Sequence, residues 1–336
     1  MGLFFSKKRK DGTLVTDGDP MIHIMPYIMR GRNESAVYYC NTVNIEPIQK
    51  YIKEKRREGK RITMFNVVVT ALLQVLNQRP NLNRFIAGRR LYKHDSFEVL
   101  YTVKTDLSDD GLESVAKIQL AEDDNIDSVT ENMTETVQSI IDGSEEKWDD
   151  KLIRYFSKAP RWLLRSILNV LRWMDFHGIL PSFFLDTIPM YSSVFVSHLG
   201  SIGGGSLFHH LYEFGTTSVF LTIGKVYEKP IKNRDGSVSW QKSVDLSFTI
   251  DERIVDGYYM IKSLNMLDQL LLNPHLLELS PKELKRLREN GTITFGHSNV
   301  TYDGDVLSAA SNGLDVSDRQ DEIGLGFAGD KMSRHV

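Results

Sequence analysis

The strongest constraint on the fold is a strand that runs into a glycine-containing turn and then into a helix. Within residues 244–250, the apolar side chains alternate with polar ones and are Val244, Leu246, Phe248 and Ile250. This period of two is typical of a strand with one buried face. The turn over residues 251–257 follows, and residues 258–272 have the pattern of an amphipathic helix. Taken alone, acidic residues and a glycine at such a turn predict a helix cap.

The remaining segments predict a domain of mixed strands and helices. Strands are predicted over residues 37–45, 90–92, 97–104, 194–197 and 218–226, and helices from Asp19-Pro20 and over residues 48–57, 63–76, 126–141 and 281–289. These elements follow no regular βαβ rhythm, so we expect an α+β layered fold and not a doubly wound sheet. The expected organisation is a flexible N-terminal arm (1–18), a folded domain (19–290) with a helical insertion at about 145–190, and a largely disordered tail (291–336).

Length and composition exclude several classes of protein. The chain has 336 residues and a formal net charge of -3, so no basic excess points to nucleic acid. Its one cysteine, Cys40, excludes an internal disulfide and a cysteine-rich metal site. The apolar run at the N-terminus is too short for a signal peptide, and no stretch reaches the roughly 18 apolar residues that span a bilayer. A cytoplasmic protein is therefore the default expectation.

Two ordered motifs resemble those of a known enzyme family. Asp251, Arg253, Asp256 and Gly257 fit the Asp-His-Arg-x-x-Asp-Gly signature of chloramphenicol acetyltransferase and of the E2 acyltransferases of 2-oxo acid dehydrogenases. Upstream, residues 195–203 are similar to the E2 stretch Phe-Thr-Ile-Ser-Asn-Leu-Gly, and the strand 220–225 also has an E2 counterpart. The resemblance covers roughly residues 19–278, with residues 145–190 as an atypical insertion.

The resemblance implies a fold, a reaction and a set of site residues. It implies the chloramphenicol acetyltransferase-like two-layer sandwich, a homotrimer with active sites between subunits, and acyl-CoA as cosubstrate without a metal. Ser197 would donate a hydrogen bond to the tetrahedral oxyanion. Asp256 would pair with an arginine, for which Arg30 and Arg32 are both open. The remaining matched residues, Arg253, Gly257 and Gly200, would shape the turns of the site, and Gly257 is expected to adopt backbone angles that other residues avoid.

The chain departs from the family at the catalytic histidine, because Glu252 occupies its place. A glutamate titrates near about 4.3 and a histidine near about 6.5, so glutamate is the poorer base unless burial raises its pKa. One hypothesis is an acyltransferase in which Glu252 is the base for a small thiol, hydroxyl or amine acceptor. The other is a catalytically degenerate trimer that serves in binding or scaffolding. In the second case Glu252 is a structural acid paired with Arg253 or with an arginine across the interface.

Other candidate features near Ser197 have simpler explanations. His198 is an alternative base, but strand alternation points it to the opposite face from Ser197. A zinc site built from His198, His209 and His210 would also need other groups to orient these ligands. We therefore predict no metal. Residues 203–205 are three glycines that lack the Lys-Ser/Thr of a phosphate-binding loop and predict a bend. The sequence shows no lipoyl-domain lysine hairpin, so we expect a free acceptor and not tethered lipoamide.

The insertion contains apolar residues, tryptophans and arginines at helical spacing between Lys151 and Phe184. This pattern predicts an amphipathic helix pair that ends near Gly178 and Pro181. Its apolar content is too high for a freely solvated helix, so something must cover it. The two alternatives are a helical hairpin packed over the acceptor channel of the trimer and a peripheral contact with a membrane surface.

Overall fold

The centre of the fold is a mixed β-sheet. The computed structural model describes residues 9–104, 113–142, 158–233, 235–296 and 300–302. The seven-stranded sheet has the order β2-β10-β8-β7-β5-β6, and β9 pairs with β10 outside this path. The strands are β2 (Ala36–Asn44), β5 (Phe97–Lys104), β6 (Glu113–Leu120), β7 (Val194–His198), β8 (Val219–Ile223), β9 (Tyr227–Lys232) and β10 (Val238–Asp251). β7 runs parallel to β5 and β8, and the other pairs are antiparallel.

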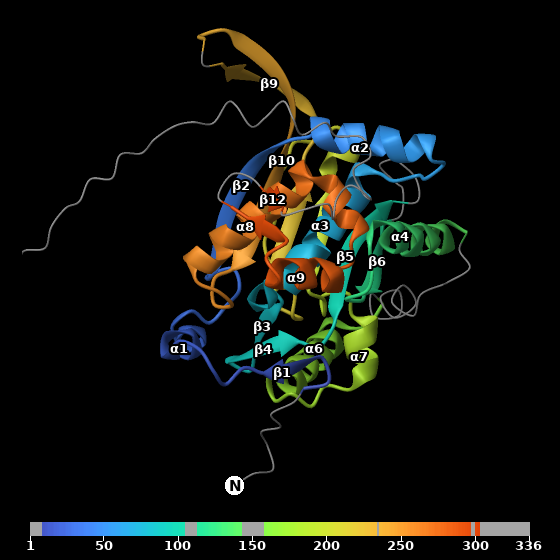
Figure 1. The fold of residues 1–336 in the computed structure, drawn as a ribbon. Helices are drawn as coiled ribbons and strands as arrows, with labels where there is room; N and C mark the ends of the chain where they lie inside the picture. Colours follow the sequence, from blue (N-terminus) through green and yellow to red (C-terminus); the bar gives the residue numbers. More distant parts are fainter. Residues whose placement is uncertain (1–8, 105–112, 143–157, 234, 297–299, 303–336) are drawn as a thin grey trace, which may run out of the picture.

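Helices cover one face of this sheet (Figure 1). They are α2 (Glu46–Arg57), α3 (Met64–Gln78), α4 (Ile126–Ile141), α8 (Gly257–Leu272) and α9 (Pro281–Glu289). α3 is central, and every residue from Asn66 to Leu76 is buried. Its apolar side chains pack in one core with sheet residues such as Leu221 and Phe248. A helix buried on all sides is apolar all round, which explains the composition of this segment. The expected two-layer α+β sandwich is confirmed.

The helix boundaries follow the capping residues. α1 (Pro20–Ile28) begins after Asp19, whose carboxylate accepts a hydrogen bond from the backbone N–H of Met21 at 2.9 Å. α3 begins after Thr63, which forms a reciprocal capping box with Asn66. Both starts were predicted from the sequence. Two strands of the sheet were not predicted from the sequence. β6 lies in the acidic stretch after residue 106, and β9 forms a projecting ribbon with the first half of β10.

A second, three-stranded sheet has the order β1-β4-β3, formed by β1 (Gly12–Leu14), β4 (Arg90–His94) and β3 (Arg84–Ala87). The prediction of a flexible arm over residues 1–18 is therefore wrong for residues 9–18, because β1 pairs with β4 and Arg9 is buried. Arg9 lies near the rings of Phe85 and Tyr92, contacts that no short-range pattern indicates. Residues 1–8 lie outside the described part of the chain.

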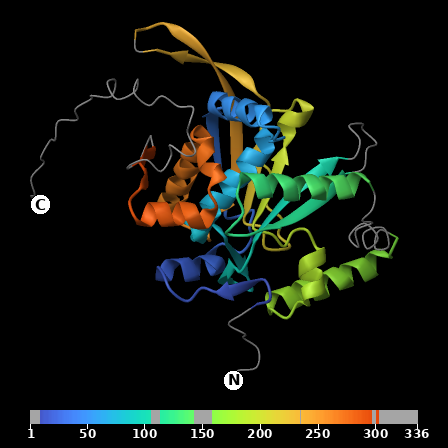
Figure 2. The same cartoon turned by 45° about the vertical axis from the view of Figure 1, so that its right-hand side comes forward.

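The remaining elements are shorter or peripheral. They are α6 (Arg161–Phe176), α7 (Ser182–Thr187), β11 (Ile293–Phe295), β12 (Val300–Tyr302) and the 3-10 turns η1 (Pro80–Leu82), η2 (Leu199–Ile202) and η3 (Pro274–Glu278). Figure 2 shows α6, in light green, at the margin of the molecule. β11 pairs with β12 inside the segment expected to be a disordered tail, and residues 303–336 lie outside the described part. Among the described helices, none combines the length and apolar character needed to cross a bilayer.

The small sheet makes stability depend on pH through His94. This residue is buried against Phe85, with 4.4 Å between the ring centroids, and burial lowers its pKa to about 4. A histidine whose folded-state pKa is lowered stabilises the fold above its unfolded pKa of about 6.5, and this contribution is lost as the pH falls towards about 4. Between about pH 7.5 and pH 4, we expect wild type to lose about 3 kcal/mol more unfolding free energy than His94→Gln. Denaturant unfolding at several pH values measures this difference, and parallel pH profiles for the two proteins would contradict it.

Candidate active site

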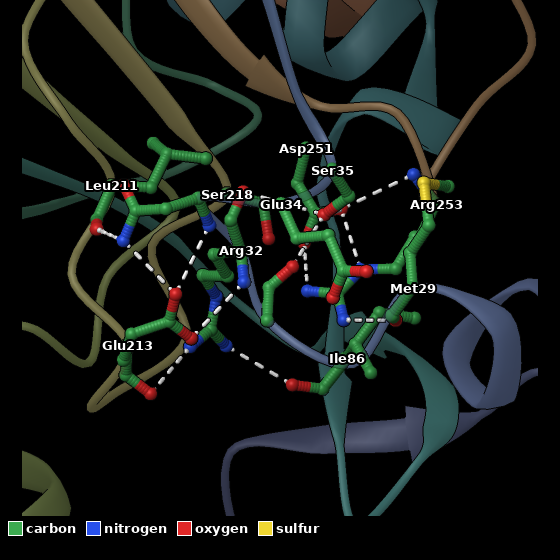
Figure 3. A network of polar contacts seen from close by, with 12 residues as sticks. Met29, Arg32, Glu34, Ser35, Ile86, Leu211, Glu213, Ser218, Asp251 and Arg253 are labelled. Atoms are coloured by element: carbon green, nitrogen blue, oxygen red, sulfur yellow. Dashed lines mark hydrogen bonds and ion pairs between the residues drawn. The ribbon is translucent and has the colours of Figure 1, made fainter.

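The turn after β10 is built around a buried ion pair. Asp251 and Arg253 are 0% and 2% exposed. The guanidinium of Arg253 donates two hydrogen bonds to the carboxylate of Asp251, from Nε to Oδ1 at 2.8 Å and from Nη2 to Oδ2 at 2.7 Å (Figure 3). The hydroxyl of Ser35 donates a further bond to Oδ1 at 2.9 Å. A buried charge pair with this two-point geometry holds both side chains in one arrangement.

The backbone on both sides of Glu252 is fixed to other elements. The N–H of Asp251 donates to the carbonyl of Ser218 at 2.9 Å, and the N–H of Glu252 donates to the carbonyl of Ser35 at 3.0 Å. Arg253 Nη1 also donates to the carbonyl of Met29 at 3.1 Å. The turn is therefore tied to the loop between α1 and β2. In the single chain the side chain of Glu252 is exposed beside this anchored backbone.

Two ion pairs that were predicted at this turn do not form within one chain. Arg253 pairs with Asp251 and not with Glu252. Asp256 is exposed and caps α8, because its Oδ1 accepts a hydrogen bond from the backbone N–H of Tyr259 at 2.8 Å. Neither Arg30 nor Arg32 forms an ion pair with Asp256 in the described residues. Arg32 instead donates to backbone carbonyls, those of Ile86, Tyr212 and Glu213.

The prediction that Gly257 adopts backbone angles that other residues avoid is also wrong. Gly257 has no positive φ, and a Cβ added at this position would meet no atom within 4 Å. It is the first residue of α8, where ordinary helical backbone angles suffice. Nothing in the single chain therefore requires glycine at this position.

A second polar network, around Glu213, was not predicted from the sequence. Its carboxylate accepts hydrogen bonds from the backbone N–H groups of Arg32 and Asn33 and from the side-chain amide of Asn33, each at 2.9–3.0 Å. Burial acts to raise the pKa of Glu213, but these bonds outweigh it and the pKa is lowered. Burial lowers the pKa of Arg32. The partners lie 180 residues or more apart in sequence, so no local pattern could have indicated them.

Ser197 lies near the end of β7, where a glycine permits close approach to β8. Ser197 is in register with Thr222 of β8, and its hydroxyl makes no hydrogen bond within the described chain. A Cβ on Gly200 would lie 2.3 Å from the carbonyl oxygen of Gly224, so only glycine fits without movement. Gly203 then has φ +79 and ends the 3-10 turn η2. The predicted glycine bend after the Ser197 strand is confirmed.

The histidines near Ser197 do not converge on it. His198 stacks on Phe65 of α3, on the helix-covered face of the sheet, with ring centroids 5.9 Å apart, and burial lowers the pKa of His198. The predicted opposite orientation of His198 and Ser197 is therefore confirmed. His209 and His210 stack on each other, and His209 also stacks on Phe220. In the described ranges, no three His, Cys, Asp or Glu side chains form a group suited to a metal ion.

The strand register keeps Ser197 and Glu252 apart in one chain. Thr222 of β8 is opposite both Ser197 and Ser247. Glu252 lies five residues beyond Ser247 in the chain, which corresponds to about 16 Å along a strand, and two strand spacings of about 4.8 Å add to this. The structure thus places Glu252, Arg253, Asp256 and Gly257 at one turn and Ser197 and Gly200 at another. A site that contains both Ser197 and Glu252 requires two chains.

Comparisons with known proteins agree with this fold. Residues 191–279, which include both motifs, match the family model of the 2-oxoacid dehydrogenases acyltransferase (catalytic domain). The structure is similar to a probable dihydrolipoamide acetyltransferase from Listeria monocytogenes, with TM-score 0.50, 17% identity and coverage of 77% of this chain and 94% of that one. It is also similar to the cubic core of a pyruvate dehydrogenase multienzyme complex, with TM-score 0.51, 15% identity and coverage of 79% and 95%. The expected family resemblance and its acyltransferase fold are confirmed.

Removal of one charge from the buried ion pair should destabilise the whole turn. We expect Asp251→Asn to lower the unfolding free energy by about 3–5 kcal/mol, because Arg253 is left buried without its charged partner. Asp256→Asn is the matched control, since asparagine caps a helix as well as aspartate, and its cost should stay within about 0.5 kcal/mol. Urea unfolding measures both. Equal effects of the two substitutions would contradict a structural role for the pair.

Proposed function

We propose that this chain is a CoA-dependent acyltransferase that transfers an acyl group from acyl-CoA to a small thiol, hydroxyl or amine acceptor. The family match over residues 191–279 supports the reaction class. The observation that carries the proposal is the anchored turn. The buried Asp251–Arg253 pair fixes the backbone next to Glu252, at the place where the resembling family has its catalytic histidine.

The proposed reaction uses two side chains. The carboxylate of Glu252 takes the proton of the acceptor X–H, and X attacks the thioester carbonyl carbon of acyl-CoA. The hydroxyl of Ser197, which is not used in other hydrogen bonds of the described chain, donates to the oxyanion of the tetrahedral intermediate. The intermediate collapses, the C–S bond breaks, and the CoA thiolate receives the proton from Glu252. The products are acyl-X and CoA, and no redox step is involved.

The assembly that we propose is a homotrimer with its active sites at subunit boundaries. The register argument supports it, because Ser197 and Glu252 lie at different ends of paired strands in one chain. One subunit would supply Ser197 and its neighbour would supply Glu252. A closed cyclic assembly satisfies this requirement at every boundary, since each head-to-tail contact is the same.

A second candidate function is a trimer that binds ligands or partners without transferring acyl groups. The substitution of glutamate for histidine favours it, as does the exposure of Glu252 in the single chain. An exposed carboxylate is a weak proton acceptor near neutral pH. The two functions differ in what a change at Glu252 does to activity and stability.

Substitutions at Glu252 separate the two candidate functions. We expect Glu252→Gln to lower acyl transfer from acetyl-CoA to a panel of thiols, alcohols and amines by about 10²–10⁴-fold, because the base is lost. The melting temperature should change little, because the ion pair that holds the turn does not involve Glu252. Glu252→His should retain or raise transfer to thiols.

The same measurements can contradict the proposal. Equal transfer rates for wild type and Glu252→Gln would reject the catalytic role of Glu252. Absence of transfer in wild type together with its appearance in Glu252→His would favour the degenerate trimer. A fall in unfolding free energy of about 1–3 kcal/mol in Glu252→Gln would indicate a structural acid instead.

A further inference from the structure

Helix α6 buries only a narrow stripe of its surface. The inward residues are Leu164, Ile167, Leu171 and Met174, of which only Leu171 is fully buried. Ile167, Leu171 and Met174 pack in a small apolar cluster separate from the main core, and this cluster includes Leu180, Leu185 and Tyr191. The rest of the circumference of α6 is left without a covering element in the described chain.

The uncovered surface has an apolar stripe beside a basic one. The apolar stripe consists of Trp162, Leu163, Val170 and Trp173, which are 70%, 36%, 56% and 57% exposed. At 100° per residue, these four positions lie within about 100° of one another around the helix axis. Arg161, Arg165 and Arg172 are all exposed and lie within about 40° of one another. The two stripes are adjacent along the whole helix, and we call them together the α6 outer face.

No acidic side chain of the described residues compensates the charge of the α6 outer face. Asp175 is the one acidic residue of α6, and its carboxylate is bound by Arg9 at 2.7 Å. Arg161, Arg165 and Arg172 have no acidic partner within the described residues. A partner for this face must therefore provide negative charge beside an apolar region.

The N-terminal segment has the same composition and joins the molecule beside α6. Arg9 is anchored at the C-terminal end of α6, where its guanidinium also donates to the carbonyl of Asp175 at 2.7 Å. The eight residues before Arg9 contain Leu3, Phe4 and Phe5, followed by Lys7 and Lys8. Arg9 and Asp175 are 166 positions apart in sequence, and their contact ties the start of the described chain to the end of α6.

We propose that the α6 outer face docks on the surface of an anionic lipid bilayer. Tryptophan and leucine enter the boundary between head groups and acyl chains, and arginine binds the lipid phosphates. A two-fold contact between two α6 outer faces fits less well, because it would place two rows of arginines together. The inference is independent of the proposed acyl transfer.

Vesicle flotation of the full-length protein tests this surface. We expect wild type to float with phosphatidylcholine vesicles that contain about 30% phosphatidylserine, and to remain at the bottom with phosphatidylcholine alone. The double substitution Trp162→Ala with Trp173→Ala should lower binding by about tenfold or more, because the inserted apolar area is lost. Each of Arg161→Gln, Arg165→Gln and Arg172→Gln should lower it by about fivefold.

Trp240→Ala is the matched control, because Trp240 is 64% exposed but lies on the ribbon of β10. Its binding should equal that of wild type, and melting temperatures verify that all variants are folded. Failure of wild type to float with the anionic vesicles would overturn the proposal. An equal loss in Trp240→Ala and in the double variant would also overturn it. If the double variant instead changes the particle mass in solution, the α6 outer face is an interface between copies and the lipid proposal is wrong.

Discussion

The ion pair between Asp251 and Arg253 is the interaction on which the proposed site depends. It lies at the junction of the longest strand and α8, and desolvation of two charges at this point is costly unless every polar atom finds a partner. Here the carboxylate accepts from Arg253 and Ser35, while the guanidinium reaches the carbonyl of Met29. The pair thereby joins β10 to the loop before β2. Glu252 lies between the two charged residues, so its backbone cannot move without breaking this network.

The sheet imposes a second constraint, which is distance. Ser197 and Glu252 lie on strands and turns of the same rigid sheet, and the register that the hydrophobic alternation fixes also sets their separation. No change of rotamer removes a separation of several residues along a strand. Cooperation between the two side chains therefore depends on assembly, and the proposed trimer follows from the geometry of a single chain together with the family resemblance.

Local patterns were enough to predict most elements and part of the site. The alternation in β10, the cap at Asp19 and the glycine bend after Ser197 each depend on neighbours within a few residues. The bonds of Arg32 to the carbonyls of Tyr212 and Glu213 could not be predicted, because these partners lie 180 and 181 positions away in the sequence. The strand β1 could not be predicted either, because its partner β4 lies about 80 residues downstream. The resemblance identified the turn around Glu252, but the pairing of Asp256 with an arginine that it implied does not occur within one chain.

Subunit complementation tests the central claim, a site shared between chains, most directly. Ser197→Ala and Glu252→Gln subunits, each inactive in acyl transfer, are co-expressed with different tags, and mixed assemblies with three times the 38.4 kDa mass of one chain are isolated. In each mixed trimer one boundary of the three joins an intact Ser197 to an intact Glu252, so about one third of the wild-type rate should return. Mixed trimers with no more activity than either parent, measured beside an active wild type, would contradict the account.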